Sequence, residues 1–262
     1  MPDGQLRKRR RLIIQPPNLN IKRLKSLHIQ QNSKGNNMSK LKLTRLEEGY
    51  RIDGIEDKHQ VIELILPDKI EGVDVVEIAG GAFFEVKLLQ KVKFPRRLVR
   101  IGDGAFDSCA ALVELKFPKT LKSIGENCFS ECFSLKKVTF QEGFESLAHH
   151  CFYMCQALET VVLPKDFKII ASGAFKCCEN LKNINLSENL EEIMYDGFAF
   201  CHGLTRFVFR NDNVDIGNCA FIRSDSCALI LCHKGSSAEH FVLNSYEYKQ
   251  DPKTLDIQYL KD

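Results

Sequence analysis

Seven phenylalanines recur in this chain at a constant interval of 23 residues, with no insertion or deletion between them. They are Phe83, Phe106, Phe129, Phe152, Phe175, Phe198 and Phe221. Self-similarity with a period of roughly 20 to 50 residues is typical of solenoids, propellers and other repeat architectures. A single repeat has no second layer against which to bury its apolar side. The copies must therefore stack and cover one another's apolar edges in a continuous core.

Other apolar columns keep the same interval. Isoleucine or leucine stands five residues before each of the seven phenylalanines, and cysteine stands three residues after five of them. The second copy, residues 98–120, shows the whole unit, in which the expected inward positions are Leu98, Ile101, Ala105, Phe106, Cys109, Leu112, Leu115 and Phe117. We expect each copy to bury this set against its neighbours.

The spacing within the unit predicts its local structure. Leu112, Leu115 and Phe117, followed by Pro118, have the L-x-x-L-x-L spacing of a leucine-rich repeat, which places one short strand in each copy. We expect a second short strand at residues 98–101 on the opposite wall, and a turn leading into one loose helical turn at residues 102–108. Strands of successive copies would lie about 4.8 Å apart in parallel ladders.

Departures from the period mark the two caps. Alternating strand-like segments at residues 41–66 predict a β-rich N-terminal cap, and the first rung carries a five-residue insertion around Glu71-Gly72. After the last rung, at residues 228–232, we expect a short helix at residues 238–243 with Ser237 as its N-cap. The predicted fold is mainly β with short helical turns, a leucine-rich repeat solenoid of about seven repeats. The predicted divisions are a basic disordered arm (1–37), the N-terminal cap and first rung (38–74), the array (75–232) and the C-terminal cap and tail (233–262).

The repeat I-G-x-x-A-F-x-x-C-x-x-L-x-x-L-x-F-P, as in Ile101 to Pro118, resembles the BspA-like leucine-rich repeat family, also called the Treponema pallidum type. The resemblance extends over residues 61–248, and the closing stretch from Leu231 to Phe241 is similar to the terminal cap of that family. Known relatives are mostly surface or secreted proteins that adhere to host proteins or other cells. The resemblance therefore implies a binding scaffold without chemistry of its own.

Targeting features and cysteines predict a cytoplasmic location. No apolar run that could serve as a signal peptide follows Met1, and no stretch approaches the roughly 18 apolar residues of a membrane span. Export by a route without such a signal, to the surface or the medium, is the alternative. The 11 cysteines stand mostly in repeat columns, which favours small buried thiols over disulfides.

Two cysteine pairs with histidines beside them superficially resemble metal ligands: Cys128, Cys132, Cys151, Cys155, His149 and His150. The repeat itself accounts for both pairs, since neighbouring copies hold alanine in the same column, so we expect no metal and no cofactor. The sequence contains no G-x-S-x-G, phosphate-binding glycine loop or H-E-x-x-H motif. We therefore expect no enzymatic activity.

The first 37 residues are strongly basic. They hold nine Lys and Arg side chains, including Arg7, Lys8, Arg9, Arg10 and Arg11, against Asp3 alone, although the whole chain has a net charge of only +3. Such an arm could tether the protein to nucleic acid or to an anionic membrane. The alternatives are a merely solvated tail, or translation that begins at Met38 instead of Met1.

The exposed face of the predicted strands is the main candidate for binding a partner. If Leu115 and Phe117 point inward, their neighbours point outward. The corresponding positions along the array are Lys91, Lys93, Glu114, Lys116, Lys137, Thr139, Thr160, Val162, Asn183, Asn185, Arg206 and Val208. Five are basic and one is acidic. We expect this face to dock an acidic or amide-rich protein segment, the alternative being an ordinary solvated sheet face.

Overall fold

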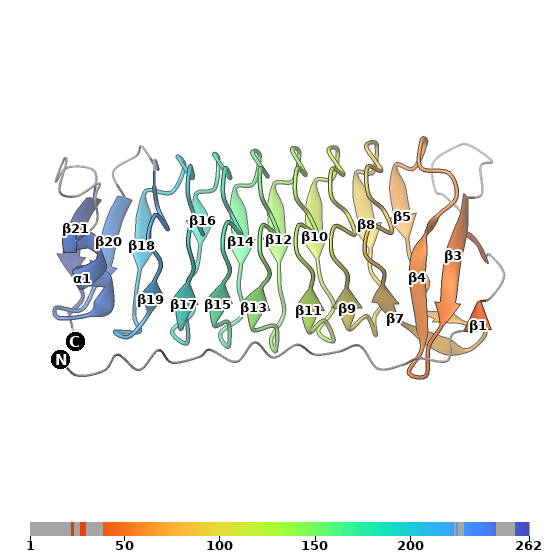
Figure 1. The fold of residues 1–262 in the computed structure, drawn as a ribbon, viewed down its shortest axis with the longest axis horizontal. Coiled ribbons are helices and arrows are strands. Elements are labelled where there is room, and N and C mark those ends of the chain that lie inside the picture. The colour runs from red at the N-terminus through yellow and green to blue at the C-terminus, as the bar shows by residue number, and fades with distance from the viewer. Residues whose placement is uncertain are drawn as a thin grey trace, which may run out of the picture.

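The structure is a computed structural model that describes residues 22–23, 27–29, 39–222, 224, 228–244 and 255–261. Successive coils stack along one direction into a rod, and each coil contributes one strand to each of two opposite walls (Figure 1). The predicted repeat solenoid is thus confirmed. Seven coils each contain one of the periodic phenylalanines, and we number them from the N-terminal end.

One side of the rod, which we call the sheet wall, is built from the strands predicted by the L-x-x-L-x-L spacing. Neighbouring strands pair in parallel, and Glu114 aligns with Lys137 as the 23-residue period requires. Each coil is counted from the few residues before its sheet-wall strand, so the second coil runs from residue 87 to 109. The first six coils contain β5 (Glu63–Ile65), β8 (Lys91–Lys93), β10 (Glu114–Lys116), β12 (Lys137–Thr139), β14 (Thr160–Val162) and β16 (Asn183–Ile184). The seventh contains β18 (Arg206–Val208), which forms a separate sheet with β20 (Ala228–Cys232) and β21 (Leu255–Tyr259).

The opposite side, the short-strand wall, is also parallel. Its strand in the second copy, β9 (Arg100–Ile101), lies within residues 98–101 and confirms the predicted second strand. The wall begins with β7 (Val73–Ile78), β9 and β11 (Ser123–Ile124). It continues in a separate ladder with β13 (Ser146–Leu147), β15 (Ile169–Ile170), β17 (Glu192–Ile193) and β19 (Asp215–Ile216).

A third side, the turn wall, closes each coil through residues such as 102–108. Local turns form there, with Ala105 N–H donating to Gly102 O at 3.3 Å. Other N–H groups reach the next coil instead, for example from Ser108 to Ser130 O at 2.8 Å. This alternation needs positive φ twice in a coil, and Gly104 (58°) adopts it without the steric cost that other residues meet. The equivalent position in other coils is held by Gly81, Asn127, His150, Gly173, Asp196 and Cys219.

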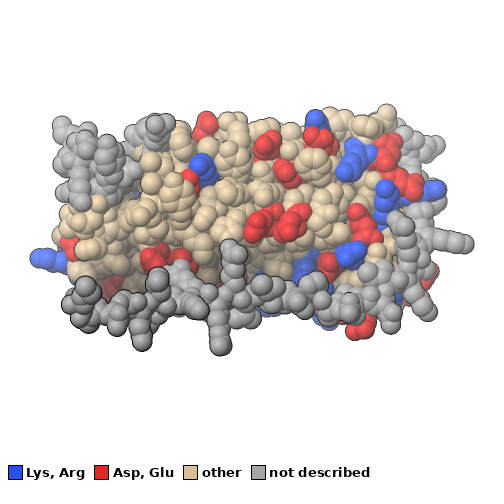
Figure 2. Space-filling model, in the orientation of Figure 1, with Lys and Arg blue, Asp and Glu red and all other residues tan. Residues whose placement is uncertain are grey.

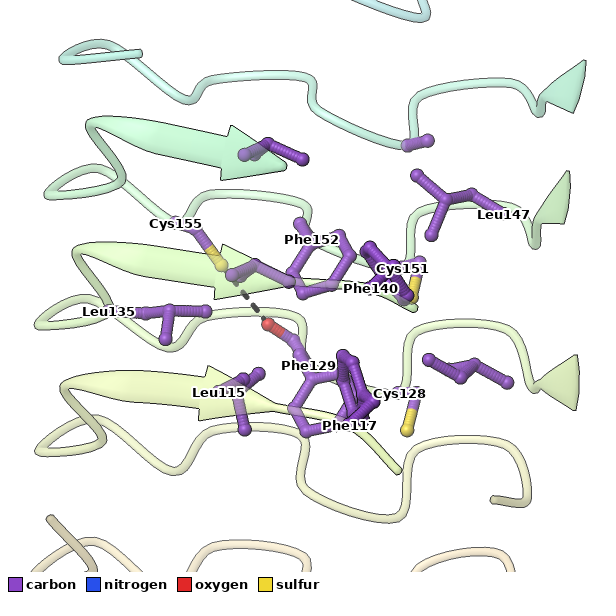
Figure 3. Close-up of a cluster of buried hydrophobic side chains, with 14 of the residues drawn as sticks. Leu115, Phe117, Cys128, Phe129, Leu135, Phe140, Leu147, Cys151, Phe152 and Cys155 are labelled. Carbon is purple, nitrogen blue, oxygen red and sulfur yellow. Dashed lines mark hydrogen bonds between the residues drawn. The ribbon is translucent and has the colours of Figure 1, made fainter. Parts of the chain in front are cut away.

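The periodic phenylalanines form one continuous stack inside the rod. Phe106 and Phe129 have ring centroids 5.3 Å apart and planes 9° apart, and the same arrangement continues to Phe221. Figure 3 shows Phe129 and Phe152 one above the other, with Phe117 and Phe140 beside them. Because each ring is buried between rings of the coils on either side, no coil has a complete core of its own.

The cysteine column does more than fill space. Cys155 Sγ lies 3.2 Å from Phe129 O in the preceding coil, the contact drawn as a dashed line in Figure 3. A thiol is a weak donor, so this contact gives the buried carbonyl a hydrogen-bond partner. The contact recurs at Cys109, Cys132, Cys178 and Cys201. Ser224 takes the same position in the last coil and donates to Phe198 O, whereas the first coil, with no phenylalanine before it, has Val86.

The N-terminal cap is a small antiparallel sheet that joins the short-strand wall. Its strands β3 (Ser39–Arg45) and β4 (Tyr50–Ile55) form a hairpin, and β4 runs parallel to β7. Two further strands, β1 (Lys22–Arg23) and β2 (Leu27–Ile29), pair with β3, so this sheet crosses the boundary predicted at residue 37. The predicted insertion is a hairpin between β6 (Lys69–Ile70) and β7, turning at Glu71 and Gly72 with φ of 50° and 80°.

Helix α1 (Ser237–Asn244) packs against the end of the rod, where Phe241 contacts Phe221 with ring centroids 5.9 Å apart. The predicted N-cap was wrong by one residue. Ser236 Oγ accepts the Glu239 N–H at 3.3 Å, while Ser237 Oγ donates to Val214 O of the preceding coil at 2.7 Å. Ser237 therefore ties the helix to the array, and its neighbour caps it.

Candidate interaction surface

The sheet wall presents a row of outward side chains on every coil. In β10, Leu115 is fully buried while Glu114 and Lys116 on either side of it are exposed, because successive side chains of a strand point to opposite faces. The same alternation recurs in the other coils. We call the outward residues of this wall the sheet face. The structure places all of the predicted positions on it, exposed at 91, 93, 114, 116, 137, 162, 183, 185 and 206, and half-buried at Thr139, Thr160 and Val208.

The lysines of the sheet face form no ion pair within 4.0 Å among the described residues, although Lys93 helps to lower the pKa of the Asp68 carboxyl. Glu114 lies between Lys91 and Lys137 in the ladder, yet among the described residues neither lysine forms an ion pair within 4.0 Å. The same holds for Lys93 and Lys116. Lys93 and Lys116 stand at equivalent positions of neighbouring strands, whose backbones lie about 4.8 Å apart, so like charges face one another there. Lys91 lies between Glu63 and Glu114.

Charges on the short-strand wall are arranged differently. Arg100 bonds to Glu77 of the adjacent strand with an N–O distance of 2.7 Å and also reaches Glu48 of the N-terminal cap. Its hydrogen bond to Glu48 raises the pKa of Arg100 and lowers the pKa of the Glu48 carboxyl. Lys168 lies between Glu145 and Glu191, at 3.4 and 3.9 Å. Here the outward charges of neighbouring coils are matched.

The rod has no single charge over its whole surface. On the side shown in Figure 2, uncharged residues predominate, and acidic side chains are scattered among fewer basic ones. Part of the turn wall has a clear acidic tendency. Burial raises the pKa of Asp107, and the nearby carboxylates of Glu131 and Glu85 add to that effect.

Sequence reasoning missed a second surface feature, a row of exposed apolar side chains beside the sheet face. We call this row the apolar edge. It consists of Ile62, Leu88, Val113 and Phe133, which are 40, 51, 39 and 38 % exposed. All four precede the sheet-wall strand of their coil, in coils one to four. In the sequence, each of these residues could have been recognised as a large apolar side chain that lies outside the eight buried positions of the repeat.

The cysteines and histidines considered as metal ligands do not form a site. Cys128, Cys132, Cys151 and Cys155 are fully buried in the core, and burial raises the pKa of each thiol well above its ordinary value. Within the part of the chain that the structure describes, no group of three or more His, Cys, Asp or Glu side chains could hold a metal ion. The ten cysteines described there are free thiols.

A hollow between β19 and α1 is lined by polar and apolar residues, among them Asp215, Ile216, Asn218, His240 and Phe241. None of the helices in the described ranges is both long enough and apolar enough to cross a membrane. The basic side chains Arg7, Lys8, Arg9, Arg10 and Arg11 lie outside the described residues.

Solved structures with the same architecture come from several bacteria. A leucine-rich repeat protein of T. pallidum is 28 % identical with a TM-score of 0.62, and the alignment covers 68 % of this chain and 83 % of that one. A leucine-rich repeat protein of Eubacterium ventriosum ATCC 27560 is 22 % identical with the same TM-score, covering 72 % of this chain and 50 % of that one. No curated protein matches the chain.

The sequence also matches a family model over the array. The model describes the BspA type leucine rich repeat region, and its six copies match residues 58–121 and 99–228. Members of this family are repeat scaffolds that typically lack catalysis and commonly bind proteins, and the two matched structures above are named only as leucine-rich repeat proteins. The stacked phenylalanine coils, the two parallel walls and this match agree, and the chain belongs to the BspA-type leucine-rich repeat family.

Proposed function

We propose that this protein is a non-catalytic scaffold that binds a protein partner through its sheet face. The observation behind the proposal is the contrast between the walls. Arg100 and Lys168 on the short-strand wall have carboxylate partners, whereas Lys91, Lys116 and Lys137 on the sheet face have none among the described residues. Unmatched charges on an accessible, regular surface are suited to pairing with another molecule.

The direct test is affinity capture from native lysate with the full chain as bait. A triple charge reversal, K91E/K116E/K137E, should abolish recovery of a stoichiometric protein partner. The matched control is K119E/K122E/K165E, which changes the net charge equally but alters exposed lysines outside the sheet face. Equal loss in both triple variants, or unchanged recovery with the sheet-face variant, would contradict the proposal.

A second candidate function is a tether to nucleic acid or anionic membrane through the basic arm, motivated by the five consecutive basic residues at positions 7–11. Salt-sensitive binding to RNA, or to vesicles containing phosphatidylserine, that disappears when Arg7 to Arg11 are replaced by serine would favour this tether. Partner capture that survives that replacement would favour the scaffold. We keep the cytoplasm as the proposed location, with a surface or secreted location as the alternative, and fractionation of cells that produce the protein separates the two.

A further inference from the structure

We propose that the partner presents a short acidic amphipathic segment, which binds along the first four coils. Its carboxylates would pair with the lysines of the sheet face, and its apolar side chains would cover the apolar edge. The inference rests on the proposed function but goes further, because it assigns the chemistry of the partner and confines the site to one half of the rod.

The apolar edge runs across the four coils, with the exposed residue Gln90 lying between Ile62 and Val113. Gln90 N–H donates to Ile62 O at 2.7 Å, and Val113 N–H donates to Gln90 O at 3.1 Å, which places these three residues side by side. Leu88 lies two residues before Gln90. In the fourth coil, Ser134 N–H donates to Ala110 O at 3.0 Å, so Phe133 beside it adjoins the third coil. The small side chains of residues 110 and 111 lie in the row between Leu88 and Phe133.

The same columns are polar in the second half of the array. At the positions equivalent to the apolar edge, coils five to seven have Gln156, Ala157, Glu159, Glu179, Asn180, Lys182, His202, Gly203 and Thr205. The repeat itself therefore does not require apolar residues here. Exposed apolar side chains that cluster on a soluble surface commonly mark an interaction site.

The unmatched positive charge is concentrated in the same coils. From the first to the fourth coil, the sheet wall and the residue before each strand provide five basic residues against two acidic ones: Lys91, Lys93, Lys116, Lys136 and Lys137 against Glu63 and Glu114. In coils five to seven the corresponding charged residues are Glu159, Lys182 and Arg206. Positive charge and exposed apolar surface thus coincide, which fits a ligand with carboxylates along one side and apolar groups along the other.

The dimensions fix the length of the segment. Four coils span three ladder spacings, about 14 Å in all. An extended peptide covers that distance with about four or five residues, and an α-helix covers it with about ten. A peptide of 12 residues is therefore long enough to occupy the whole site in either conformation.

The test is selection of random 12-residue displayed peptides on the purified full-length chain. Enriched peptides should combine Asp or Glu with Leu, Ile or Phe. One synthetic enriched peptide is then titrated by fluorescence anisotropy against L88S/F133S and K91E/K116E, each of which should weaken binding about tenfold or more. Tyr195→Ser and K165E/K182E are the controls, since they change an exposed aromatic side chain and two exposed lysines in the other half, outside the sheet face. They should change the dissociation constant less than about twofold.

Every variant retains the basic arm, so non-specific attraction of acidic peptides to it stays constant, and equal circular dichroism and thermal midpoints establish that the variants fold. Failure to enrich acidic amphipathic peptides, or equal weakening by the controls, would overturn this inference. The scaffold proposal would still stand if the lysate partner were captured through the sheet face.

Binding to vesicles with 30 % phosphatidylserine that depends on Leu88 and Phe133, without peptide enrichment, would assign the surface to a membrane. A dimer in sedimentation velocity that L88S/F133S dissociates would assign it to a second copy of the chain. Either result would replace the peptide partner.

Discussion

The two walls of the rod share one interior but use their outer surfaces differently. On the short-strand wall, Arg100 and Glu77 pair across neighbouring coils, so outward charges help to hold the stack together. On the sheet wall, Lys91 lies between Glu63 and Glu114, and Lys137 lies beside Glu114, yet neither lysine forms an ion pair within 4.0 Å among the described residues. The same 23-residue repeat generates both walls. The difference must therefore lie in positions that folding leaves unconstrained, and those positions can be adapted to a partner.

The largest expected effect on stability comes from interrupting the phenylalanine stack, which lies in the interior that the two walls share. Phe129→Ala should lower the free energy of unfolding by about 3–5 kcal/mol, because it leaves a cavity between two stacked rings. Chemical denaturation followed by circular dichroism measures the loss. If the coils depend on one another, the unfolding transition should also broaden or divide at the third coil, which contains Phe129. A loss below about 1 kcal/mol would mean that this stack does not stabilise the rod.

The second-largest expected effect on stability comes from substitutions in the cysteine column. Cys155→Ala should cost about 1–2 kcal/mol, because it removes buried volume and one partner of Phe129 O. Cys155→Ser should cost less, since a hydroxyl keeps the donor, as Ser224 does in the last coil. Thermal and chemical denaturation of the two variants under reducing conditions provide the comparison. A serine variant less stable than the alanine variant would show that the thiol acts only as an apolar filler.

The walls themselves should differ in their response to alanine. Arg100→Ala should lower the free energy of unfolding by about 0.5–1 kcal/mol, since the ion pairs it removes are partly exposed. Lys116→Ala on the sheet face should stay within about 0.5 kcal/mol of the original protein. Repeating both measurements in 1 M NaCl should shrink the Arg100 effect by screening. Equal costs at the two positions would remove the distinction between the walls.

The smallest expected effect concerns the turn wall. Because burial raises the pKa of Asp107 in the folded state, the folded protein binds a proton more readily than the unfolded chain. The stability linked to this group is therefore greatest below the unfolded pKa and falls as the pH rises through the folded pKa. Asp107→Asn should raise the thermal midpoint slightly at pH 7, and the gain should disappear below about pH 4. A variant that is less stable at pH 7 would contradict this reading.

Much of the fold could be predicted because the period is visible in buried side chains. The phenylalanine column, the strand that contains Leu115 and the strand that ends at Ile101 all follow from apolar spacing, and the structure confirms them. Spacing could not show how the turn wall is bonded. There the backbone adopts positive φ at residues as different as Gly104 and His150, and only hydrogen bonds to the next coil make that conformation favourable.

The candidate site was only partly predictable for a similar reason. Alternation along a strand identifies which side chains point outward, so the basic sheet-face positions could be named in advance. The apolar edge could not, because Leu88 and Phe133 are 45 residues apart and occupy different columns of the repeat. The N-cap of α1 was misassigned because Ser236 and Ser237 are chemically alike, and only the position of the preceding coil decides which of them caps the helix.

By itself, the sequence determined that identical coils must stack and which side chains they bury, because an apolar set repeated at a constant interval can escape water only between copies of itself. The tertiary structure decided which outward groups meet. Pairing Arg100 with Glu48, leaving Lys91 unmatched and joining the apolar residues of four coils into one edge all depend on distances between coils. Those distances are set by backbone hydrogen bonds between coils, which no residue in a single repeat specifies alone.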